Sequence, residues 1–255
     1  MKRVLSTATL LGRREVASGT WILELAYDSS APFRAGQFVM VQPRVEGCLL
    51  PRPFSILALE DGVLQILVKE LGKGSRAMAQ KAPGAQMEIF GPLGRAFPPE
   101  LSSREALILV AGGVGIVPLR CLQLEFAPLG TRLVPLMGAH RARDLPHELL
   151  DGWELWVEED PRSGMREGVV THGLLEALER FPEATVACCG PTAMMKEVAR
   201  ISLDRETETW VCLEEQMACG AGVCRSCVIA AADGSRMRPV CKEGPVFPLN
   251  EIQYA

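Results

Sequence analysis

The chain has 255 residues, of which 48% are hydrophobic and 23% charged, and its formal net charge is -4. This ordinary globular composition excludes a wholly disordered chain, and the lack of a basic excess disfavours nucleic acid as a partner. The longest apolar run, residues 106–119, is too short to cross a bilayer and is interrupted by glycine and proline. The sequence therefore predicts no membrane span.

The N-terminus carries a faint resemblance to a signal peptide, because Lys2 and Arg3 precede two apolar residues. Arg13 and Arg14 follow soon after, and no cleavage site is evident, so we expect a β-strand here and a cytoplasmic protein. Disulfides are rare in that compartment. The nine cysteines of the chain therefore point to metal or redox chemistry.

Residues 1–101 are expected to form a small antiparallel β-barrel domain, because short β-rich segments follow one another closely with turns between them. Glu60-Asp61-Gly62 is a hairpin signal between two of these segments. A helix is expected to begin at Ser75, which is a good N-cap residue. The expected strands cover residues 21–25, 37–41, 54–59 and 63–69.

Residues 102–206 are expected to form an α/β domain with a doubly wound sheet, because strand and helix patterns alternate. The fully apolar strand at 106–111 is typical of a parallel sheet that is buried on both faces. Further strands are expected at 132–138, 153–158 and 184–189, and helices at 115–126, 171–180 and 191–203. The fold class is thus α+β and multidomain.

Residues 207–255 hold five of the nine cysteines in a short, turn-rich segment. A segment of this size forms too small a core to be stable without a metal site or another cross-link. Cys219, Cys224 and Cys227 form a C-x4-C-x2-C pattern, and Cys241 follows. This spacing is that of plant-type [2Fe-2S] proteins, in which each iron takes two thiolates. Glycines between the first two cysteines allow the loop to curl tightly around such a group.

Two other interpretations of the four cysteines remain. A zinc site favours paired C-x2-4-C motifs, and Cys241 has no such companion. Structural disulfides are disfavoured by the expected compartment. We therefore predict a [2Fe-2S] domain, and we expect Cys121, Cys188 and Cys212 to be buried thiols that act as small hydrophobic side chains.

A series of short motifs runs through the first two domains. Arg52-Pro53-Phe54-Ser55 opens a predicted strand, and Gly72-Lys73-Gly74-Ser75 opens a helix, whose N-terminus suits a pyrophosphate. Gly112-Gly113-Val114-Gly115 follows the first parallel strand, where open α/β sheets bind ligands. Cys189-Gly190-Pro191 ends a later strand, and we expect the methionines after it to pack in the core.

In this order, and with Gly91-Pro92-Leu93-Gly94 between them, these motifs resemble the ferredoxin–NADP reductase superfamily. The resemblance implies a barrel that binds FAD and an α/β domain that binds a pyridine nucleotide. It places Arg52 on the pyrophosphate and Ser55 near the reactive N5 of the flavin. The implied FAD contacts are Arg52, Pro53, Phe54, Ser55, Leu67, Val68, Lys69, Gly74 and Ser75. The implied nicotinamide nucleotide contacts are Gly112, Gly113, Gly115, Cys189, Gly190 and Pro191.

The last fifty residues resemble one particular family within this superfamily. Residues 213–220 and 240–247 are similar to the electron-transfer subunits of class 1B dihydroorotate dehydrogenases, and this similarity extends over the whole chain. It assigns the metal ligands to Cys219, Cys224, Cys227 and Cys241. The chain departs from that family at Ser75, where threonine is usual, and at Phe54, where an aliphatic residue is common.

The resemblance implies that electrons pass from FMN in a catalytic dihydroorotate dehydrogenase subunit through the [2Fe-2S] cluster and FAD to NAD+. This is a step of pyrimidine biosynthesis, and the family assembly is a heterotetramer of two plus two subunits. The chain itself shows no evident site for an organic substrate, and none of its three histidines belongs to a motif. One alternative is a related reductase subunit of a ferredoxin-, sulfide- or hydrogenase-linked complex. A second is a non-enzymatic structural module whose C-terminal segment is stabilised by a zinc ion.

Overall fold

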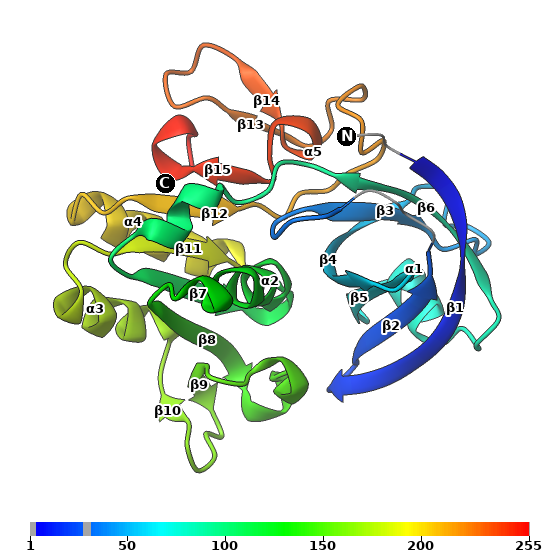
Figure 1. Ribbon diagram of the computed structural model, residues 1–255. Coiled ribbons are helices and arrows are strands. Elements are labelled where there is room, and N and C mark those ends of the chain that lie inside the picture. The colour runs from blue at the N-terminus through cyan, green and yellow to red at the C-terminus, as the bar shows by residue number, and fades with distance from the viewer. Residues whose placement is uncertain (1–3, 28–31, 255) are drawn as a thin grey trace.

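The computed structural model describes residues 4–27 and 32–254. Its first part is a closed antiparallel barrel with the strand order β1-β2-β5-β4-β3-β6 (Figure 1). The N-terminal segment is thus a strand, as expected, and it pairs with both β2 and β6. The strands are β1 Val4–Ala17, β2 Thr20–Ala26, β3 Phe38–Gln42, β4 Arg52–Glu60, β5 Val63–Lys69 and β6 Gln86–Leu93.

Alternation along these strands fills the barrel with apolar side chains. Leu23, Leu25, Ile56 and Ile66 are almost completely buried and share one core cluster. The hairpin between β4 and β5 forms at Asp61 and Gly62, which both adopt positive φ, as the sequence predicts. These features confirm the predicted antiparallel barrel.

The first helix, α1 (Lys73–Ala79), begins two residues before the predicted start at Ser75. Ser75 lies in the first turn, not at its cap. Its hydroxyl oxygen accepts hydrogen bonds from the N–H groups of Leu71 (3.0 Å) and Gly72 (3.1 Å), so it reaches back to close the loop before the helix. The prediction therefore placed the start of the helix too late, because Ser75 is the third helical residue and bonds back to the N-cap backbone.

The second part is an α/β sheet with the order β10-β9-β8-β7-β11-β12-β15, parallel except for the antiparallel last pair. It contains the predicted strands and extends beyond residue 206, because β12 and β15 join its edge. The strands are β7 Leu107–Gly112, β8 Leu133–Arg141, β9 Glu154–Glu159, β10 Arg166–Glu167, β11 Thr185–Cys189, β12 Thr209–Cys212 and β15 Val246–Pro248.

The helices of this part cover both faces of the sheet, as a doubly wound fold requires. The helix α2 (Ile116–Phe126) packs on the face that carries Leu107 and Leu109, whereas α3 (Val170–Arg180) and α4 (Thr192–Asp204) pack on the face that carries Ile108 and Val110. Short 3-10 turns complete the connections: η1 Pro99–Ser103, η2 Gly113–Gly115, η3 Ala127–Leu129, η4 Ala142–Asp144, η5 His147–Leu149 and η6 Leu249–Glu251.

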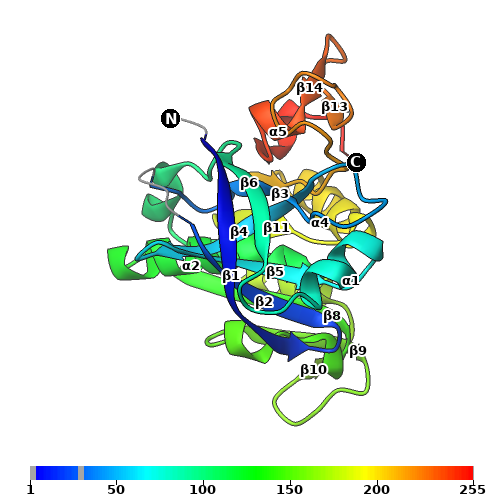
Figure 2. The same ribbon diagram turned by 90° about the vertical axis from the view of Figure 1, so that its right-hand side faces the viewer.

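The remaining residues form what we call the cysteine segment, residues 213–245. It contains a small hairpin, β13 (Val228–Ala230) and β14 (Met237–Pro239), and the short helix α5 (Val240–Glu243). In Figure 2 this segment stands at one end of the molecule, away from β9 and β10. Its two ends are tied to the sheet, because β12 precedes it and β15 follows it.

The barrel and the sheet are joined by specific contacts along α2. The Cys121 thiol donates to the carbonyl oxygens of Ile56 (3.1 Å) and Leu57 (2.9 Å) on β4. Arg34 forms an ion pair of 2.6 Å with Glu125, whose other oxygen accepts the N–H of Ala35. Cys121 is buried, as expected, and burial raises the pKa of its thiol to about 12, so it acts as a packing group.

Candidate functional site

On the barrel, Arg52 lies directly against the start of α1. A Cβ atom on Gly74 would lie 2.6 Å from Nε and 2.8 Å from Cζ of Arg52, so a glycine is needed for the guanidinium to approach the helix backbone. Arg52 also donates to the carbonyl oxygen of Leu50. The structure thus brings together a cation and the first turn of a helix, which is the arrangement that a pyrophosphate requires.

The other predicted barrel residues occupy the adjacent strands. Phe54 and Ser55 of β4 are half-buried and pair with Val39 and Phe38 of β3. On β5, Leu67 and Val68 are buried and Lys69 is half-buried. Pro53 pairs with Met40 on the same strand pair as Phe54.

A small hollow, here called the barrel–sheet hollow, lies where β5 meets the glycine loop of the α/β part. Its lining residues are Thr20, Leu67, Lys69, Gly113, Val114, Asp144 and Pro146. It therefore brings residues predicted to contact the flavin beside residues predicted to contact the nicotinamide nucleotide. Two redox groups that exchange hydride must meet at such a junction.

The two predicted nucleotide loops contact each other directly. A Cβ atom on Gly115 would lie 2.3 Å from the carbonyl oxygen of Cys189, and one on Gly112 would lie 2.8 Å from Cδ of Pro191. Gly113, with a φ of +56°, faces open space. The loops after β7 and β11 are thus neighbours at the carboxyl edge of the sheet, where the strand order reverses and ligands bind.

Met194 closes one side of these loops. Its Sδ would lie 2.7 Å from a Cβ atom on Gly112, and its Cε would lie 2.7 Å from one on Gly190. Met195 is buried in the core, as expected, whereas Met194 is only half-buried and packs against the glycines. The sequence did not separate the roles of these two methionines.

Sequence reasoning also missed a carboxylate that the cysteine segment contributes to this edge. The Cys189 thiol lies 3.9 Å from Oε1 of Glu214, a contact between residues 25 positions apart. The pKa of Glu214 is raised because neighbouring groups remove water from its carboxyl, although the residue keeps an exposed edge. Glu214 belongs to the stretch 213–220 that carries the family resemblance, but nothing in that stretch places it beside Cys189, so only the folded chain reveals the contact.

The four predicted metal ligands gather in the cysteine segment as two pairs. Cys219 and Cys224 lie within hydrogen-bonding reach of each other, and so do Cys227 and Cys241. In the described ranges of the chain, no three His, Cys, Asp or Glu side chains converge as ligands of a single metal ion. Two thiol pairs match the needs of a two-iron cluster, in which each iron takes two thiolates.

Backbone N–H groups of the loop point at the sulfurs. Ala221 donates to Sγ of Cys219 (3.3 Å), and Gly222 donates to Sγ of Cys241 (3.2 Å). Such donors stabilise thiolates and tune a bound cluster. Gly220 and Gly222 both adopt positive φ, which confirms the predicted tight curl of the loop.

The two pairs differ in their environment. Cys224 is exposed, and hydrogen bonds from Ser226 lower its pKa to about 6. Burial raises the pKa of Cys241 to about 12, and its neighbour Cys227 adds to this rise. Cys224 therefore faces solvent, Cys219 is partly buried, and Cys227 and Cys241 lie inside, so a group held among the four sulfurs has one outward edge at Cys224.

The cysteine segment packs against the barrel. A Cβ atom on Gly220 would lie 2.5 Å from Cγ of Met40 on β3 and 3.0 Å from Cδ1 of Leu93 on β6. The loop that carries the thiols thus lies on β3 and β6, and β3 pairs directly with β4, which carries Arg52 and Phe54. The predicted cluster loop is therefore in packing contact with the barrel that carries the predicted flavin contacts.

Comparisons with known proteins identify two of the domain types that the sequence predicts. Residues 7–97 match the model of the oxidoreductase FAD-binding domain, and residues 214–253 match that of the iron-sulfur cluster binding domain of dihydroorotate dehydrogenase B. The chain therefore has an FAD-binding domain and an iron–sulfur binding domain. Within the described residues, no helix is long and apolar enough to cross a membrane.

Curated relatives match over nearly the whole chain. The dihydroorotate dehydrogenase B (NAD(+)) electron transfer subunit of Desulforamulus reducens is 32% identical, and the match covers 97% of each chain. That of Listeria monocytogenes is 30% identical, over 96% of this chain and 97% of its own.

Among solved structures, a chain of an NADH-dependent reduced ferredoxin–NADP oxidoreductase superimposes with a TM-score of 0.85 and 24% identity, over 98% of this chain and 90% of that one. A ferredoxin NADP+ reductase from Neisseria gonorrhoeae superimposes with a TM-score of 0.68 and 16% identity, over 79% of this chain and 91% of that one. These likenesses confirm the predicted fold.

Proposed function

Because the chain belongs to the family of dihydroorotate dehydrogenase B electron transfer subunits, we propose that it carries electrons from the FMN of a catalytic dihydroorotate dehydrogenase subunit to NAD+. The route is a [2Fe-2S] cluster and FAD, and the pathway is pyrimidine (UMP) biosynthesis. FAD, when bound, can exchange hydride with NAD and single electrons with an iron–sulfur cluster.

We propose that each of the three consecutive parts of the chain binds one of the redox groups. Residues 1–101 hold FAD, residues 102–206 bind the nicotinamide nucleotide with β12 and β15 widening their sheet, and residues 207–255 hold the cluster. The contact between Arg52 and Gly74 supports the pyrophosphate site, and the meeting of the loops at Gly115 and Cys189 supports the nucleotide site. Ser75 contributes its backbone N–H, because its hydroxyl already accepts from the loop.

The single observation that carries this proposal is the placement of the thiols. The cysteine segment packs on β3 and β6 of the barrel through Gly220, and Cys224 is exposed to solvent. An electron carrier in this position has one side toward the FAD domain and the other open to a partner. The four cluster ligands are Cys219, Cys224, Cys227 and Cys241.

The outward edge is a suitable docking surface for the catalytic subunit. Val223 is 81% exposed beside Cys224, and Met237 is 44% exposed. Arg225 joins these residues, because its guanidinium donates to the carbonyl oxygen of Met237. We propose that this surface meets the FMN-containing partner in a heterotetramer of two plus two subunits. All nine cysteines are free thiols, which suits the proposed cytoplasmic location.

One alternative has its own support. The likeness to the chain of a ferredoxin–NADP oxidoreductase complex, with a TM-score of 0.85, covers almost the whole of both chains. The same sites can serve any partner that delivers single electrons to the cluster. The second candidate is therefore a reductase subunit of a ferredoxin-, sulfide- or hydrogenase-linked complex.

A reconstitution experiment separates the candidates. The purified chain, loaded with FAD and cluster, is mixed with a purified catalytic dihydroorotate dehydrogenase subunit, and NADH formation from dihydroorotate is followed. We expect NADH only when both subunits are present. The proposal fails if this pair produces no NADH while reduced ferredoxin, sulfide or a hydrogenase supports NADH formation by the same preparation.

A further inference from the structure

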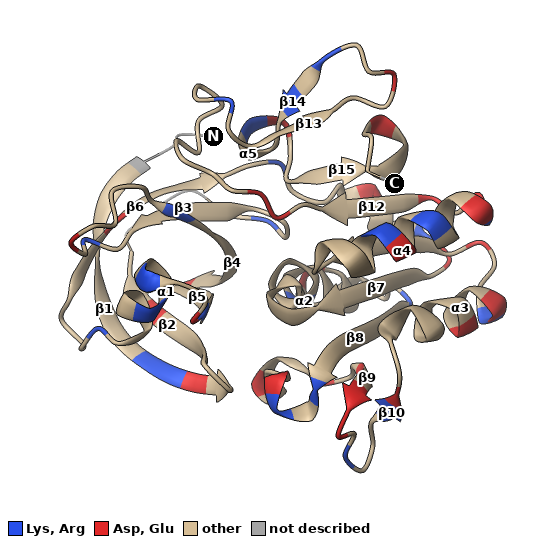
Figure 3. Ribbon diagram, turned by 180° about the vertical axis from the view of Figure 1, so that it is seen from behind, with Lys and Arg blue, Asp and Glu red and all other residues tan. Residues whose placement is uncertain are grey.

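A network of four charged side chains joins the cysteine segment to the end of the chain. Arg236 precedes β14, Arg238 lies on β14, Glu243 lies on α5, and Glu251 lies on the turn η6. Figure 3 shows these basic and acidic residues close together around β14, α5 and the C-terminus. The network therefore connects the helix that carries Cys241 with the residues that follow β15.

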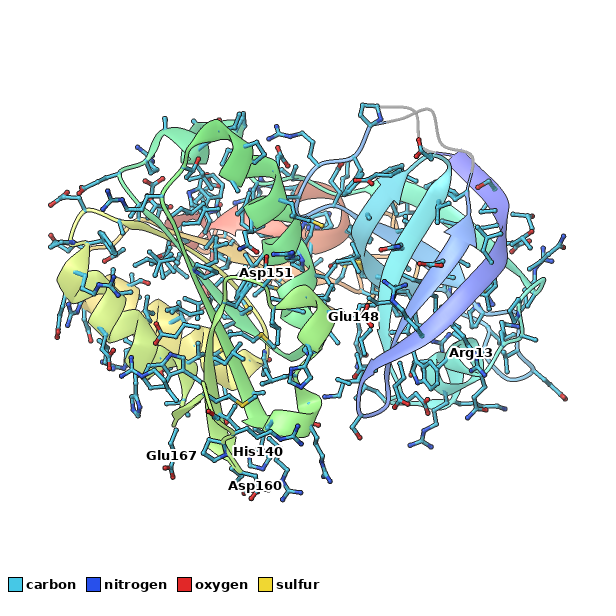
Figure 4. The ribbon with its side chains drawn as sticks, turned by 60° about the horizontal axis from the view of Figure 1, so that its bottom comes forward. Arg13, His140, Glu148, Asp151, Asp160 and Glu167 are labelled. Atoms are coloured by element: carbon cyan, nitrogen blue, oxygen red, sulfur yellow. The ribbon has the colours of Figure 1, made fainter. Side chains whose placement is uncertain are left out.

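Arg238 is withdrawn from solvent, which is unusual for a charged side chain. Charged residues at the rim of the α/β part point away from the protein, as Figure 4 shows for Asp160 and Glu167. The Arg238 side chain is only 11% exposed, whereas that of Arg236, two residues earlier, is 56% exposed. A guanidinium that is removed from water needs acceptors that compensate for its lost hydration.

Two carboxylates and one aromatic ring surround the Arg238 guanidinium. Its Nε donates to Oε2 of Glu243 (3.0 Å), and one terminal nitrogen donates to Oε2 of Glu251 (2.8 Å). Its Cζ atom lies 4.7 Å from the centre of the Phe247 ring. A planar guanidinium can bond to two carboxylates and stack on a ring at the same time, which an ammonium group cannot do. We call these four residues the arginine clamp.

The arginine clamp acts on the short helix that carries Cys241. The helix α5 has only four residues, too few to be stable without contacts to the rest of the chain. Its first residue is anchored, because the N–H of Val240 donates to the carbonyl oxygen of Cys227 (2.7 Å). Its last residue is Glu243, which Arg238 holds. Cys241 therefore lies between two anchors, and the arginine clamp supplies one of them.

Phe247 connects the arginine clamp to the α/β sheet. The residue is fully buried on β15 and pairs with Val211 on β12. A Cβ atom on Gly244 would lie 2.2 Å from Cε2 of Phe247, so the chain that leaves α5 turns closely over this ring. The position of Cys241 is thus set by the edge of the sheet as well as by the loop that carries the other three cysteines.

We propose that Arg238 is a positioning residue for the iron–sulfur cluster, because the arginine clamp keeps Sγ of Cys241 beside Cys227. The inference rests on the cluster site of the proposed function and extends it beyond the four ligands. Arg238 acts on Cys241 through α5 and is not itself a ligand. Groups that orient metal ligands typically change metal retention about 10- to 100-fold when they are removed. The proposal adds no chemical step to the electron route.

The first test measures how fast the full chain, loaded with FAD and cluster, loses iron to the chelator bathophenanthroline disulfonate. We expect Arg238→Leu to lose iron about tenfold or more faster than the parent. Arg238→Lys should lie between the two, because it keeps the charge but not the paired bonds. Glu251→Gln, which weakens only the bond to η6, should also accelerate the loss.

Arg236→Ala is the matched control. Arg236 binds the same carboxylate as Arg238, through bonds of 2.7 and 2.8 Å to Glu243, but it is exposed. Exposed ion pairs contribute little, so its rate of iron loss should stay within about twofold of the parent. A control that loses iron as fast as Arg238→Leu would overturn the proposal, because any loss of charge near Glu243 would then have the same effect.

Electron paramagnetic resonance of the reduced cluster provides a readout that a purely structural role would not change. We expect shifted or broadened g values in Arg238→Leu and in Glu251→Gln, and the spectrum of the parent in Arg236→Ala. If Arg238→Leu does not fold, Arg238→Lys and Glu251→Gln still carry the test. Lower thermal stability with unchanged g values and unchanged iron loss would overturn the proposal. A parent chain that binds no iron would instead contradict the proposed function.

Discussion

The Cα of Gly115 faces the carbonyl group of Cys189 so closely that a Cβ atom there would lie 2.3 Å from its oxygen and 2.4 Å from its carbon. This contact locks the loop after β7 to the loop after β11. Neither carbonyl atom can move away easily, because Cys189 ends a central strand that is buried on both faces. The edge of the sheet where the nucleotide is expected to bind is therefore set by a backbone–backbone contact.

Gly115→Ala should consequently destabilise the protein and weaken nucleotide binding. Gly115 has helical dihedral angles, and alanine favours a helix by up to about 1 kcal/mol over glycine, so the intrinsic effect alone would stabilise. The clash reverses the sign, and we expect a net loss of about 1–3 kcal/mol. Thermal unfolding and the KM for NADH measure the two effects. A variant as stable as the parent would show that the loops are not in contact.

The sequence alone predicts much of this architecture, for physical reasons. The strand at 106–111 is apolar throughout, and the helices after it are long enough to show their period, so the doubly wound sheet is visible locally. The short strands β12 and β15 cannot be predicted in this way, because a strand of three or four residues is too short to show a periodic pattern. Their place in the sheet depends on pairing between residues about 36 positions apart.

The candidate sites, like the strands, can be predicted where their residues lie close together in the sequence. The spacing of the four cysteines predicts a cluster site, because such a site needs one local loop that supplies three thiolates and one nearby residue that supplies the fourth. The contact between Glu214 and Cys189 escapes sequence reasoning, because it arises where the separate strands β11 and β12 end at the same edge of the sheet. The roles of the individual flavin and nucleotide contacts stay predictions that the following variants test.

Arg52→Ala should weaken the retention of FAD. If the guanidinium binds the pyrophosphate, its loss removes a charge-assisted contact worth about 1.5–3 kcal/mol. The ratio of flavin to protein after extensive dialysis measures this effect. Normal retention by the variant would count against the role of Arg52.

Gly74→Ala tests the same site from the other side. The new Cβ atom would lie 2.6 Å from Nε of Arg52 and should push the guanidinium away, so FAD retention should fall although Arg52 is intact. Gly72→Ala is the matched control in the same loop, because nothing lies within 4 Å of its Cβ position and its φ of -144° suits any residue. If both variants lose FAD equally, the contact with Arg52 is not the cause.

Cys224→Ser should abolish the iron–sulfur cluster, because a serine oxygen replaces a thiolate poorly at iron. FAD should remain, since the barrel holds it through different residues. Iron and sulfide analysis of the purified variant provides the measurement. Cys121→Ser is the control, because this buried thiol bonds to β4 and lies outside the cysteine segment; its iron content should equal that of the parent. Full iron content in the Cys224 variant would contradict the ligand assignment.

The same variant should separate the two halves of the electron route. Reduction of ferricyanide by NADH needs only the nucleotide site and FAD, so Cys224→Ser should keep most of this diaphorase activity. Formation of NADH from dihydroorotate with the catalytic subunit needs the cluster between the two flavins, so it should fall at least about a hundredfold, on the order of 2.7 kcal/mol in barrier height. Parallel assays on one preparation provide the comparison.

Equal losses in both assays would show that the cluster is needed for folding, because a general defect in structure would affect FAD and its reactions as well. Retention of both activities would show that electrons reach FAD without passing the cysteine segment, and the proposed order of carriers would be wrong.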